Sequence, residues 1–400
     1  MIQEGALPGD RLAGMNCEER NAVQGHVWAA YFGGKPVRVP IILGTNTRYF
    51  MLNEDANPEH ISFEDYSRSP EIMFDAALKF QRWARFNILQ DAELGLPERW
   101  YISPDFQNYY EANWFGCKVR YMDGQVPDTL PDFADCPERV MESGLPGPFE
   151  NSYARALDYY DYFLNRAGRE TFLGRPITAN APSCGMGTDG PFTVACNLFN
   201  PAFVCECLGS DPGRIVRLLE FITEATIQRI RAWRSLFRMP FPVDNWGIAD
   251  DSIALISTRM YREFILPLHK RIYDTFATPV KRSIHLCGDA TRHFKTMVDE
   301  LQIKQFDTGF PVDFRKVREE LGPDVRILGG PHVELLRASS PEKIRLEVKR
   351  ILETGIAESG RFILREGNNL APYTPLENTE AMYHAGIEFG KICEQAPAKQ

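Results

Sequence analysis

The chain has 400 residues, of which 44% are hydrophobic and 25% charged, a composition typical of a globular protein with a sizeable core. Its formal net charge of -9, with 45 lysines and arginines scattered along the chain, argues against a nucleic-acid partner. No run approaches the roughly 20 apolar residues of a membrane helix, so no membrane segment is expected. Nine cysteines without regular spacing, and no apolar stretch at the start of the chain, predict a protein of the reducing cytoplasm.

Short apolar runs alternate with longer amphipathic segments along the whole chain. Residues 18–32 predict a helix that stops at Gly33 and Gly34, and residues 37–43 predict a buried strand after it. Further strands are predicted at residues 100–103, 177–180, 241–249, 283–286, 305–307, 325–328 and 361–364. Helices are predicted between them at residues 70–88, 152–167, 211–237, 257–276, 290–300, 313–321 and 341–354.

Eight strands separated by helices predict an α/β protein with parallel pairing, closed into a (β/α)8 TIM barrel. An open, doubly wound sheet is the competing fold, but Gly44-Thr45-Asn46-Thr47 is not the glycine-rich phosphate turn that usually follows its first strand. We expect a single barrel domain over residues 37–395 with an N-terminal helical extension over residues 1–36. Residues 123–148, rich in Pro, Asp and Gly, predict a loop over the barrel mouth rather than a domain boundary.

The most informative stretch is Ser283 to Asp289, which contains a His-x-Cys pair. Successive side chains of a strand point to opposite faces, so His285 and Cys287 point the same way. An imidazole and a thiolate are suitable ligands for zinc. The structural alternative, a buried histidine and an inert buried cysteine, is the more common explanation of an isolated pair.

Polar side chains follow every predicted strand, and active sites of TIM barrels lie at these strand ends. For any one residue, capping of the next helix is an equally good explanation, but eight polar strand ends in a row weaken it. They include Asn46, Arg48, Asp105, Asn180, Asp250, Asp251, His285, Cys287, Asp307, His332, Glu366 and Asn368.

The chain resembles the uroporphyrinogen decarboxylase superfamily, which includes porphyrinogen decarboxylases and zinc-dependent corrinoid methyltransferases. The resemblance extends from about residue 37 to about residue 390. It rests on residues 190–193 (GPFT), the following helix, residues 249–251 (ADD), residues 285–288 (HLCG) and residues 374–378 (TPLEN). It implies the barrel fold, whereas the activity varies within the superfamily.

Departures from the family patterns separate these activities. The decarboxylases have an arginine-rich segment after the first strand, where this chain keeps only Arg48, and a Gly-His-Gly loop that is replaced here by Gly-Asn-Asn at residues 367–369. Asp105 stands where they carry a pyrrole-binding aspartate. The His-x-Cys pair matches the methyltransferases, whose third zinc ligand, a cysteine of the last loop, is missing near Asn368. Glu366 is the nearest capable replacement, with His332 and Asp251 in reserve; an ion pair with Arg365 is the structural alternative for Glu366.

The resemblance therefore implies a zinc-dependent methyltransferase that moves a methyl group between a small substrate and the cobalt of a corrinoid held by a separate carrier protein. A homodimer is a candidate assembly. Asp250 and Asp251 are candidates to orient water or donate a proton, together with Asp105 as a further catalytic candidate. The residues expected to contact the substrate are Asn46, Arg48, Tyr49, Trp114, Phe115, Asn180 and Asn368.

The aromatic residues among them favour a methoxylated aromatic donor and O-demethylation, unless they only pack the loops on the barrel. Two other functions stay open. The first is a metal-independent decarboxylase of a porphyrinogen-like or smaller acid, which would depend on Asp105 and Arg48. The second is a non-catalytic barrel that binds a corrinoid or tetrapyrrole.

Overall fold

The computed structural model describes residues 3–392, and the chain divides into two compact units. Unit 1 comprises residues 1–58, 79–98 and 305–400, and unit 2 comprises residues 59–78 and 99–304. Two elements pass from unit 2 into unit 1 along the chain, namely helix α4 (Pro70–Asn87) and strand β8 (Ile303–Thr308). Residues 393–395 of the predicted barrel range lie outside the described residues.

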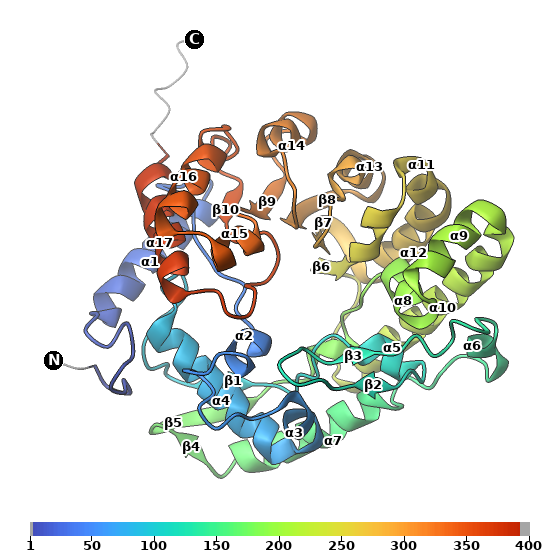
Figure 1. Cartoon of the computed structure of the whole chain (residues 1–400), viewed down its shortest axis with the longest axis horizontal. Coiled ribbons are helices and arrows are strands. Elements are labelled where there is room, and N and C mark those ends of the chain that lie inside the picture. The colour runs from blue at the N-terminus through green and yellow to red at the C-terminus, as the bar shows by residue number, and fades with distance from the viewer. Residues whose placement is uncertain (1–2, 393–400) are drawn as a thin grey trace. The chain divides into compact units, whose positions relative to one another are not determined.

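Unit 1 carries three parallel strands. Its remaining elements are α1 (Cys17–Phe32), α2 (Thr47–Met51), α14 (Phe314–Leu321), β9 (Arg326–Gly329), α15 (Val333–Ala338), α16 (Pro341–Leu352), β10 (Phe362–Leu364) and α17 (Leu376–Phe389). Strand β9 pairs in parallel with β8 on one side and with β10 on the other. Helices α16 and α17 pack against each other (Figure 1).

The predicted first strand, residues 37–43, is extended but forms only isolated bridges, of which Ile41 to Leu364 of β10 is parallel. Pro40 explains this, because proline has no N–H to donate to a ladder. The segment is held instead by the buried carboxylate of Asp91, which accepts hydrogen bonds from the Arg38 guanidinium at 2.5 and 2.7 Å and from the amide of Ile41 at 2.8 Å. A buried ion pair therefore fixes the strand that opens the barrel pattern.

Unit 2 contains the other strands and the longest helix. Its elements are α3 (Phe63–Arg68), β1 (Trp100–Ile102), α5 (Tyr110–Trp114), β2 (Val119–Arg120), β3 (Asp128–Thr129), α6 (Arg139–Glu142), α7 (Ser152–Ala167), β4 (Thr171–Phe172), β5 (Arg175–Ala179), η1 (Ser183–Gly185), α8 (Pro191–Phe199), α9 (Pro201–Ser210), α10 (Pro212–Leu236), β6 (Val243–Ala249), η2 (Asp251–Leu255), α11 (Thr258–Met260), η3 (Tyr261–Ile265), α12 (Leu266–Phe276), β7 (Ala277–Leu286) and α13 (Thr291–Leu301).

The described strands of unit 2 form two parallel pairs, and β2 with β3 and β4 with β5 pair antiparallel. Strand β1 pairs with β5, and β6 pairs with β7. A single parallel bridge from Asp189 to Ala249 connects the segment after β5 to β6. Helices α8, α9 and α10 pack together (Figure 1). The side chain of Asp211 caps α10 by accepting the amide of Arg214, and Pro212 supplies the fixed backbone angle suited to the first helical turn.

The structure confirms the predicted α/β class and the parallel pairing. The predicted closed ring of eight strands is not formed by hydrogen-bonded ladders within either unit, among residues 3–392. Pro40 accounts for part of this, since it interrupts the first strand. Between the segment after β5 and β6 there is one bridge, from Asp189 to Ala249, where a ladder was expected. The predicted loop at residues 123–148 contains β3 and the short helix α6.

None of the helices in residues 3–392 is, by itself, long and apolar enough to cross a membrane. Helices α8 and α9 meet the requirement of length and composition only when they are taken together, and they are bent by 111° at their junction. Nearly all residues of α8 are buried inside the protein.

Candidate metal centre

The paired strands β6 and β7 end side by side and place the central residues of the candidate site. Ala249 lies opposite His285 in the parallel register. Ile284 and Leu286 are buried in the core, so the alternation of the strand turns His285 to the other face. Gly247 permits the close approach of the strands, because a Cβ at this position would clash with Ser283.

Three side chains gather at these strand ends. The ligand atoms of Asp251, His285 and Cys287 all lie within 4.8 Å of one another, and the three residues are half-buried. His285 Nε2 and Cys287 Sγ are 3.0 Å apart. The backbone amide of Cys287 donates to Asp251 Oδ1 at 2.7 Å, which fixes the two chain segments against each other. The sequence predicted the His-x-Cys pair and named Asp251 as a reserve ligand, and the structure brings these three together.

The donor set suits zinc. Zinc is bound by histidine nitrogen, cysteine sulfur and carboxylate oxygen, and catalytic zinc sites have three protein ligands and an open fourth position. Zinc–ligand bonds of about 2.0–2.3 Å in a tetrahedral arrangement place neighbouring ligand atoms roughly 3.5 Å apart. The three ligand atoms lie within 4.8 Å of one another, a spacing compatible with a shared metal ion.

Asp250, the neighbouring aspartate, is fully buried and has partners inside unit 2 for both oxygens. Oδ1 accepts hydrogen bonds from the amide and hydroxyl of Thr193 at 2.8 and 2.7 Å. Oδ2 lies 2.7 Å from His269 Nε2, and His269 Nδ1 lies 3.2 Å from the hydroxyl of Tyr261. The predicted catalytic role of Asp250 stays a prediction; its contacts suit a positioning role, since it anchors the turn that carries Asp251.

A second buried polar cluster adjoins the site and was missed by the sequence analysis. Arg229 of α10 is fully buried, lies 3.5 Å from Glu111 Oε1 and donates to the carbonyl of Gly187 at 2.7 Å. Glu111 also accepts the amide of Asp189 at 3.2 Å. Burial, followed by the negative charges of Glu111 and Asp251, raises the pKa of Asp189 well above its usual value. An arginine in the apolar stripe of a long helix was the signal that could have revealed this cluster.

Glu366, the predicted third ligand, belongs to unit 1 and has partners there. Its Oε1 accepts the amide of Gly44 at 2.7 Å and lies 3.4 Å from the Arg365 guanidinium, as the ion-pair alternative predicted. Arg365 also binds Asp307 at 2.7 Å. Glu366 Oε2 is buried without a hydrogen-bond partner among the described residues. Burial raises the pKa of Glu366 to about 7.

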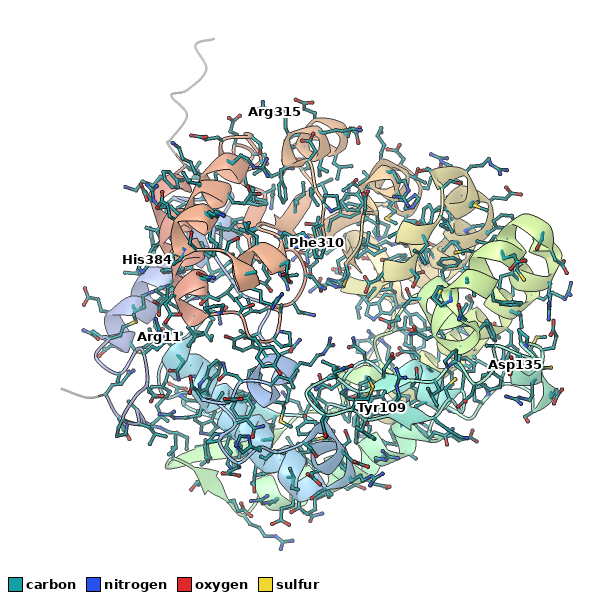
Figure 2. All side chains as sticks on the ribbon, in the orientation of Figure 1. Arg11, Tyr109, Asp135, Phe310, Arg315 and His384 are labelled. Carbon is teal, nitrogen blue, oxygen red and sulfur yellow. The ribbon has the colours of Figure 1, made fainter. Side chains whose placement is uncertain are left out.

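His332 and Asn368, the other predicted residues of this region, also lie in unit 1. His332 Nδ1 accepts the amide of Glu334 at 2.9 Å and so caps α15. Its ring contacts that of Phe310, labelled in Figure 2, at a tilt of 44° with the ring centroids 3.5 Å apart. Asn368 has a positive φ of 105°, and its carbonyl accepts from Arg365 at 2.9 Å. These contacts of His332 and Asn368 stabilise the local structure of unit 1.

The residues after the first predicted strand support a short helix. Asn46 caps α2 by accepting the amides of Arg48 and Tyr49 at 3.0 and 3.4 Å. Arg48 is half-buried on that helix. Tyr49 is fully buried and its hydroxyl donates to the carbonyl of Thr374 at 2.5 Å, while burial raises its pKa to about 12. Tyr49 therefore packs inside unit 1, whereas the sequence analysis expected it to contact the substrate.

The predicted residues that follow β1 and β5 lie in unit 2. Asp105 accepts hydrogen bonds from the amide and side chain of Gln107 at 2.9 and 3.0 Å. Trp114 is almost fully buried and donates to the carbonyl of Gly147 at 2.7 Å, and its ring contacts that of Phe115. These contacts fit the alternative in which the aromatic residues only pack the loops on the barrel. Asn180 is exposed, with its amide bonded to Ile102 at 2.7 Å.

Comparisons with known proteins indicate the family of the chain. The family model described as uroporphyrinogen decarboxylase (URO-D) matches residues 25–389. The methylated-thiol–coenzyme M methyltransferase of Methanosarcina mazei is 24% identical over 307 residues, which are 74% of this chain and 72% of that protein. The methylcobamide:CoM methyltransferase MtaA of Methanosarcina barkeri is 27% identical over 211 residues, which are 51% of this chain and 57% of that protein, so the match spans little more than half of this second relative.

A solved structure shows the same fold. A methyltransferase from Methanosarcina mazei matches with a TM-score of 0.61 and 21% identity, covering 92% of this chain and 98% of that chain. The family and this structure imply a TIM barrel, as the sequence predicted. Because the family model covers most of the chain, the protein belongs to the uroporphyrinogen decarboxylase (URO-D) family.

Proposed function

We propose that this protein is a zinc-dependent methyltransferase that moves a methyl group between a small substrate and the cobalt of a corrinoid held by a partner protein. The observation that carries the proposal is the grouping of Asp251, His285 and Cys287, whose donor atoms suit a catalytic zinc ion. The two curated relatives reported above are methyltransferases, one named for methylated thiols and one for methylcobamide, which supports the reaction class.

The chain's own residues would hold and shape the metal site. His285 and Cys287 supply nitrogen and sulfur, and Asp251 supplies an oxygen while its Oδ1 holds the amide of Cys287. A bound zinc ion supplies Lewis acidity, which lowers the pKa of a thiol or polarises the heteroatom that carries the methyl group. Asp250 holds the turn of Asp251 through Thr193 and His269, so the oxygen ligand is preorganised.

Asp251 replaces Glu366 as our proposed third ligand. Both are carboxylates, but Asp251 lies in the same unit as the His-x-Cys pair and next to it, whereas Glu366 Oε1 contacts Gly44 and Arg365 in unit 1. A carboxylate in place of the family's cysteine makes the site less thiolate-rich, hence more electron-poor and a stronger Lewis acid.

The methyl-bearing substrate is a small molecule with a methylated sulfur or oxygen. The aromatic residues that favoured a methoxylated arene now support it less, because Tyr49 and Trp114 are buried and their polar atoms are hydrogen-bonded internally. We therefore favour a methylated thiol or a thiol acceptor over O-demethylation. The same reaction requires a partner protein that carries the corrinoid. We also propose that the protein acts in the cytoplasm.

The proposal is tested by mixing zinc-loaded protein with methylcob(III)alamin and a panel of thiols, and cob(I)alamin with methyl thioethers and methoxyarenes. We expect interconversion of the methylcobalt and cob(I)alamin spectra, and its loss in Cys287→Ala, His285→Ala and Asp251→Ala. Cys136→Ser, which alters an exposed free cysteine, serves as the matched control and keeps activity. Activity that persists in EDTA with release of carbon dioxide would select the decarboxylase, and tight corrinoid binding without turnover the non-catalytic barrel.

A further inference from the structure

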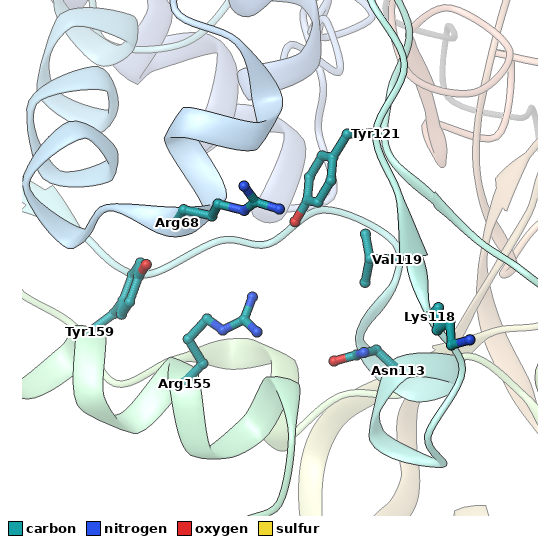
Figure 3. A pocket seen from close by; sticks show the side chains of 7 residues that line it. All are labelled: Arg68, Asn113, Lys118, Val119, Tyr121, Arg155 and Tyr159. Atoms are coloured by element: carbon teal, nitrogen blue, oxygen red, sulfur yellow. The ribbon is translucent and has the colours of Figure 1, made fainter.

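A pocket of about 560 Å³ lies in unit 2, and none of its lining residues belongs to the metal centre. Its lining comes from the end of α3, from α5, from the segment around β2 and from α7, and it includes Arg68, Asn113, Lys118, Tyr121, Arg155 and Tyr159. In Figure 3 the guanidinium groups of Arg68 and Arg155, the hydroxyl of Tyr121 and the amide of Asn113 point toward a common space. Small-molecule sites commonly have volumes of roughly 300–1,000 Å³.

The lining is positively charged and contains no carboxylate. Arg155 makes no ion pair with any of the described residues, and its guanidinium lies over the ring of Phe106 at 5.8 Å. Arg68 pairs with Glu64 at 2.6 Å, but both side chains are exposed, and an exposed pair of this kind is weak and readily exchanged. Lys118 adds a third positive charge. Cations that share a cavity repel one another, and a bound anion relieves the repulsion.

The neutral residues of the lining fix its shape and leave one acceptor unused. The hydroxyl of Tyr159 donates to the carbonyl of Ser67 at 3.0 Å, and the hydroxyl of Tyr121 lies 3.3 Å from that of Tyr109, so both rings are held in place. Asn113 donates through Nδ2 to the carbonyl of Cys117 at 2.9 Å. Its Oδ1 is buried without a hydrogen-bond partner among the described residues. A buried acceptor without a partner is costly, so a ligand that donates a hydrogen bond would satisfy it.

We propose that this pocket binds a small organic oxyanion whose phosphate, sulfonate or carboxylate group lies between the guanidinium groups of Arg68 and Arg155, and which also donates a hydrogen bond to Asn113. Planar guanidinium groups hold such oxyanions through paired N–H donors. The volume exceeds that of an inorganic ion, which leaves room for an organic body between Tyr121 and Tyr159. The site is separate from the metal centre and does not depend on the proposed methyl transfer.

The test is calorimetric titration of the full chain at low ionic strength with three matched probes: 4-hydroxyphenyl phosphate, 4-hydroxybenzenesulfonate and 4-hydroxybenzoate. We expect at least one to bind, and the rank order identifies the oxyanion. Neutral 4-hydroxybenzyl alcohol should not bind. Arg155→Gln and Arg68→Gln should each weaken binding about tenfold or more, and the double variant should abolish it. Arg169→Gln removes one positive charge from an exposed position outside the pocket and should leave binding unchanged.

Three results would overturn the proposal: no binding of any of the three probes, equal binding by the double variant, or loss of binding when EDTA removes the metal. Arg68 is exposed at the end of a short helix, so Arg68→Gln tests the site even if Arg155→Gln fails to fold. Arg155→Lys keeps the charge but loses the paired donors, and it should bind more weakly than the wild type. Zinc content should be unchanged in every variant, which separates this test from that of the methyltransferase.

Discussion

Glu366 offers a quantitative test of the electrostatics of unit 1. Its carboxyl is fully buried; Oε1 is held by the amide of Gly44 at 2.7 Å, and Oε2 has no partner among the described residues. Burial raises its pKa from 4.5 to about 7, in spite of the nearby charge of Arg365. Glu366→Gln keeps the shape and the acceptor for Gly44 but cannot ionise.

The direction in which the free energy of unfolding changes with pH follows from proton binding. Between pH 4.5 and about 7 the folded state keeps the proton on Glu366 while the unfolded state releases it, so the free energy of unfolding of the wild type falls as pH rises. Each pKa unit corresponds to 1.36 kcal/mol, and the full shift therefore corresponds to roughly 3 kcal/mol. Below pH 4.5 both states are protonated and the effect vanishes. Above about pH 7 both are ionised, and the whole loss is present.

Urea unfolding at several pH values between 4.5 and 8, with EDTA present, measures this effect. The wild type should lose roughly 3 kcal/mol relative to Glu366→Gln across that range, with most of the change between pH 5 and 7. Glu334→Gln is the control, since Glu334 is exposed and its pKa is lowered by the hydrogen bond with Arg337. A difference between the wild type and Glu366→Gln that does not change with pH, or that grows in the opposite direction, would refute the reasoning.

Substitutions at two further positions test packing in unit 2. Asp250→Ala removes the partner of His269 in a fully buried pair and should lower the free energy of unfolding by about 3–5 kcal/mol, whereas Asp250→Asn, which keeps the shape, should cost about 1–3 kcal/mol; equal losses in urea unfolding would contradict the account. Gly185→Ala places a Cβ against the ring of Trp233 and should destabilise by about 1–3 kcal/mol, and an unchanged midpoint would show that the contact is not tight.

The sequence predicted the elements well wherever hydrophobic periodicity was long. Helix α7 has the predicted bounds, and α10, β1 and β6 differ from theirs by one or two residues. It failed where local chemistry overrides periodicity. Residues 37–43 read as a buried strand, but the missing N–H of Pro40 and the ion pair of Arg38 with Asp91 make them an extended segment with isolated bridges. The five-residue helix α2 was too short to show a period, although Asn46 is a typical helix cap.

Part of the candidate site could be predicted because it lies within a few residues of one strand. His285 and Cys287 share a face by the alternation of β7 alone. Asp251 comes from the end of β6, and its nearness to the pair depends on the parallel register of two strands 36 residues apart. Arg229 could have been noticed as an arginine in the apolar stripe of α10, but its pairing with Glu111 could not be predicted, since that contact joins α5 and α10 through tertiary packing alone.

The central claim is that Asp251, His285 and Cys287 hold a catalytic metal ion. The most direct measurement is the zinc content of chelator-stripped and repleted full-length protein, together with the absorption spectrum after cobalt(II) replaces zinc. We predict about one metal ion per chain, a thiolate-to-cobalt charge-transfer band that disappears in Cys287→Ala, and weakened binding in His285→Ala and Asp251→Ala but not in Glu366→Gln. Protein that takes up no metal, or that keeps the same affinity and spectrum in Cys287→Ala, would contradict the account.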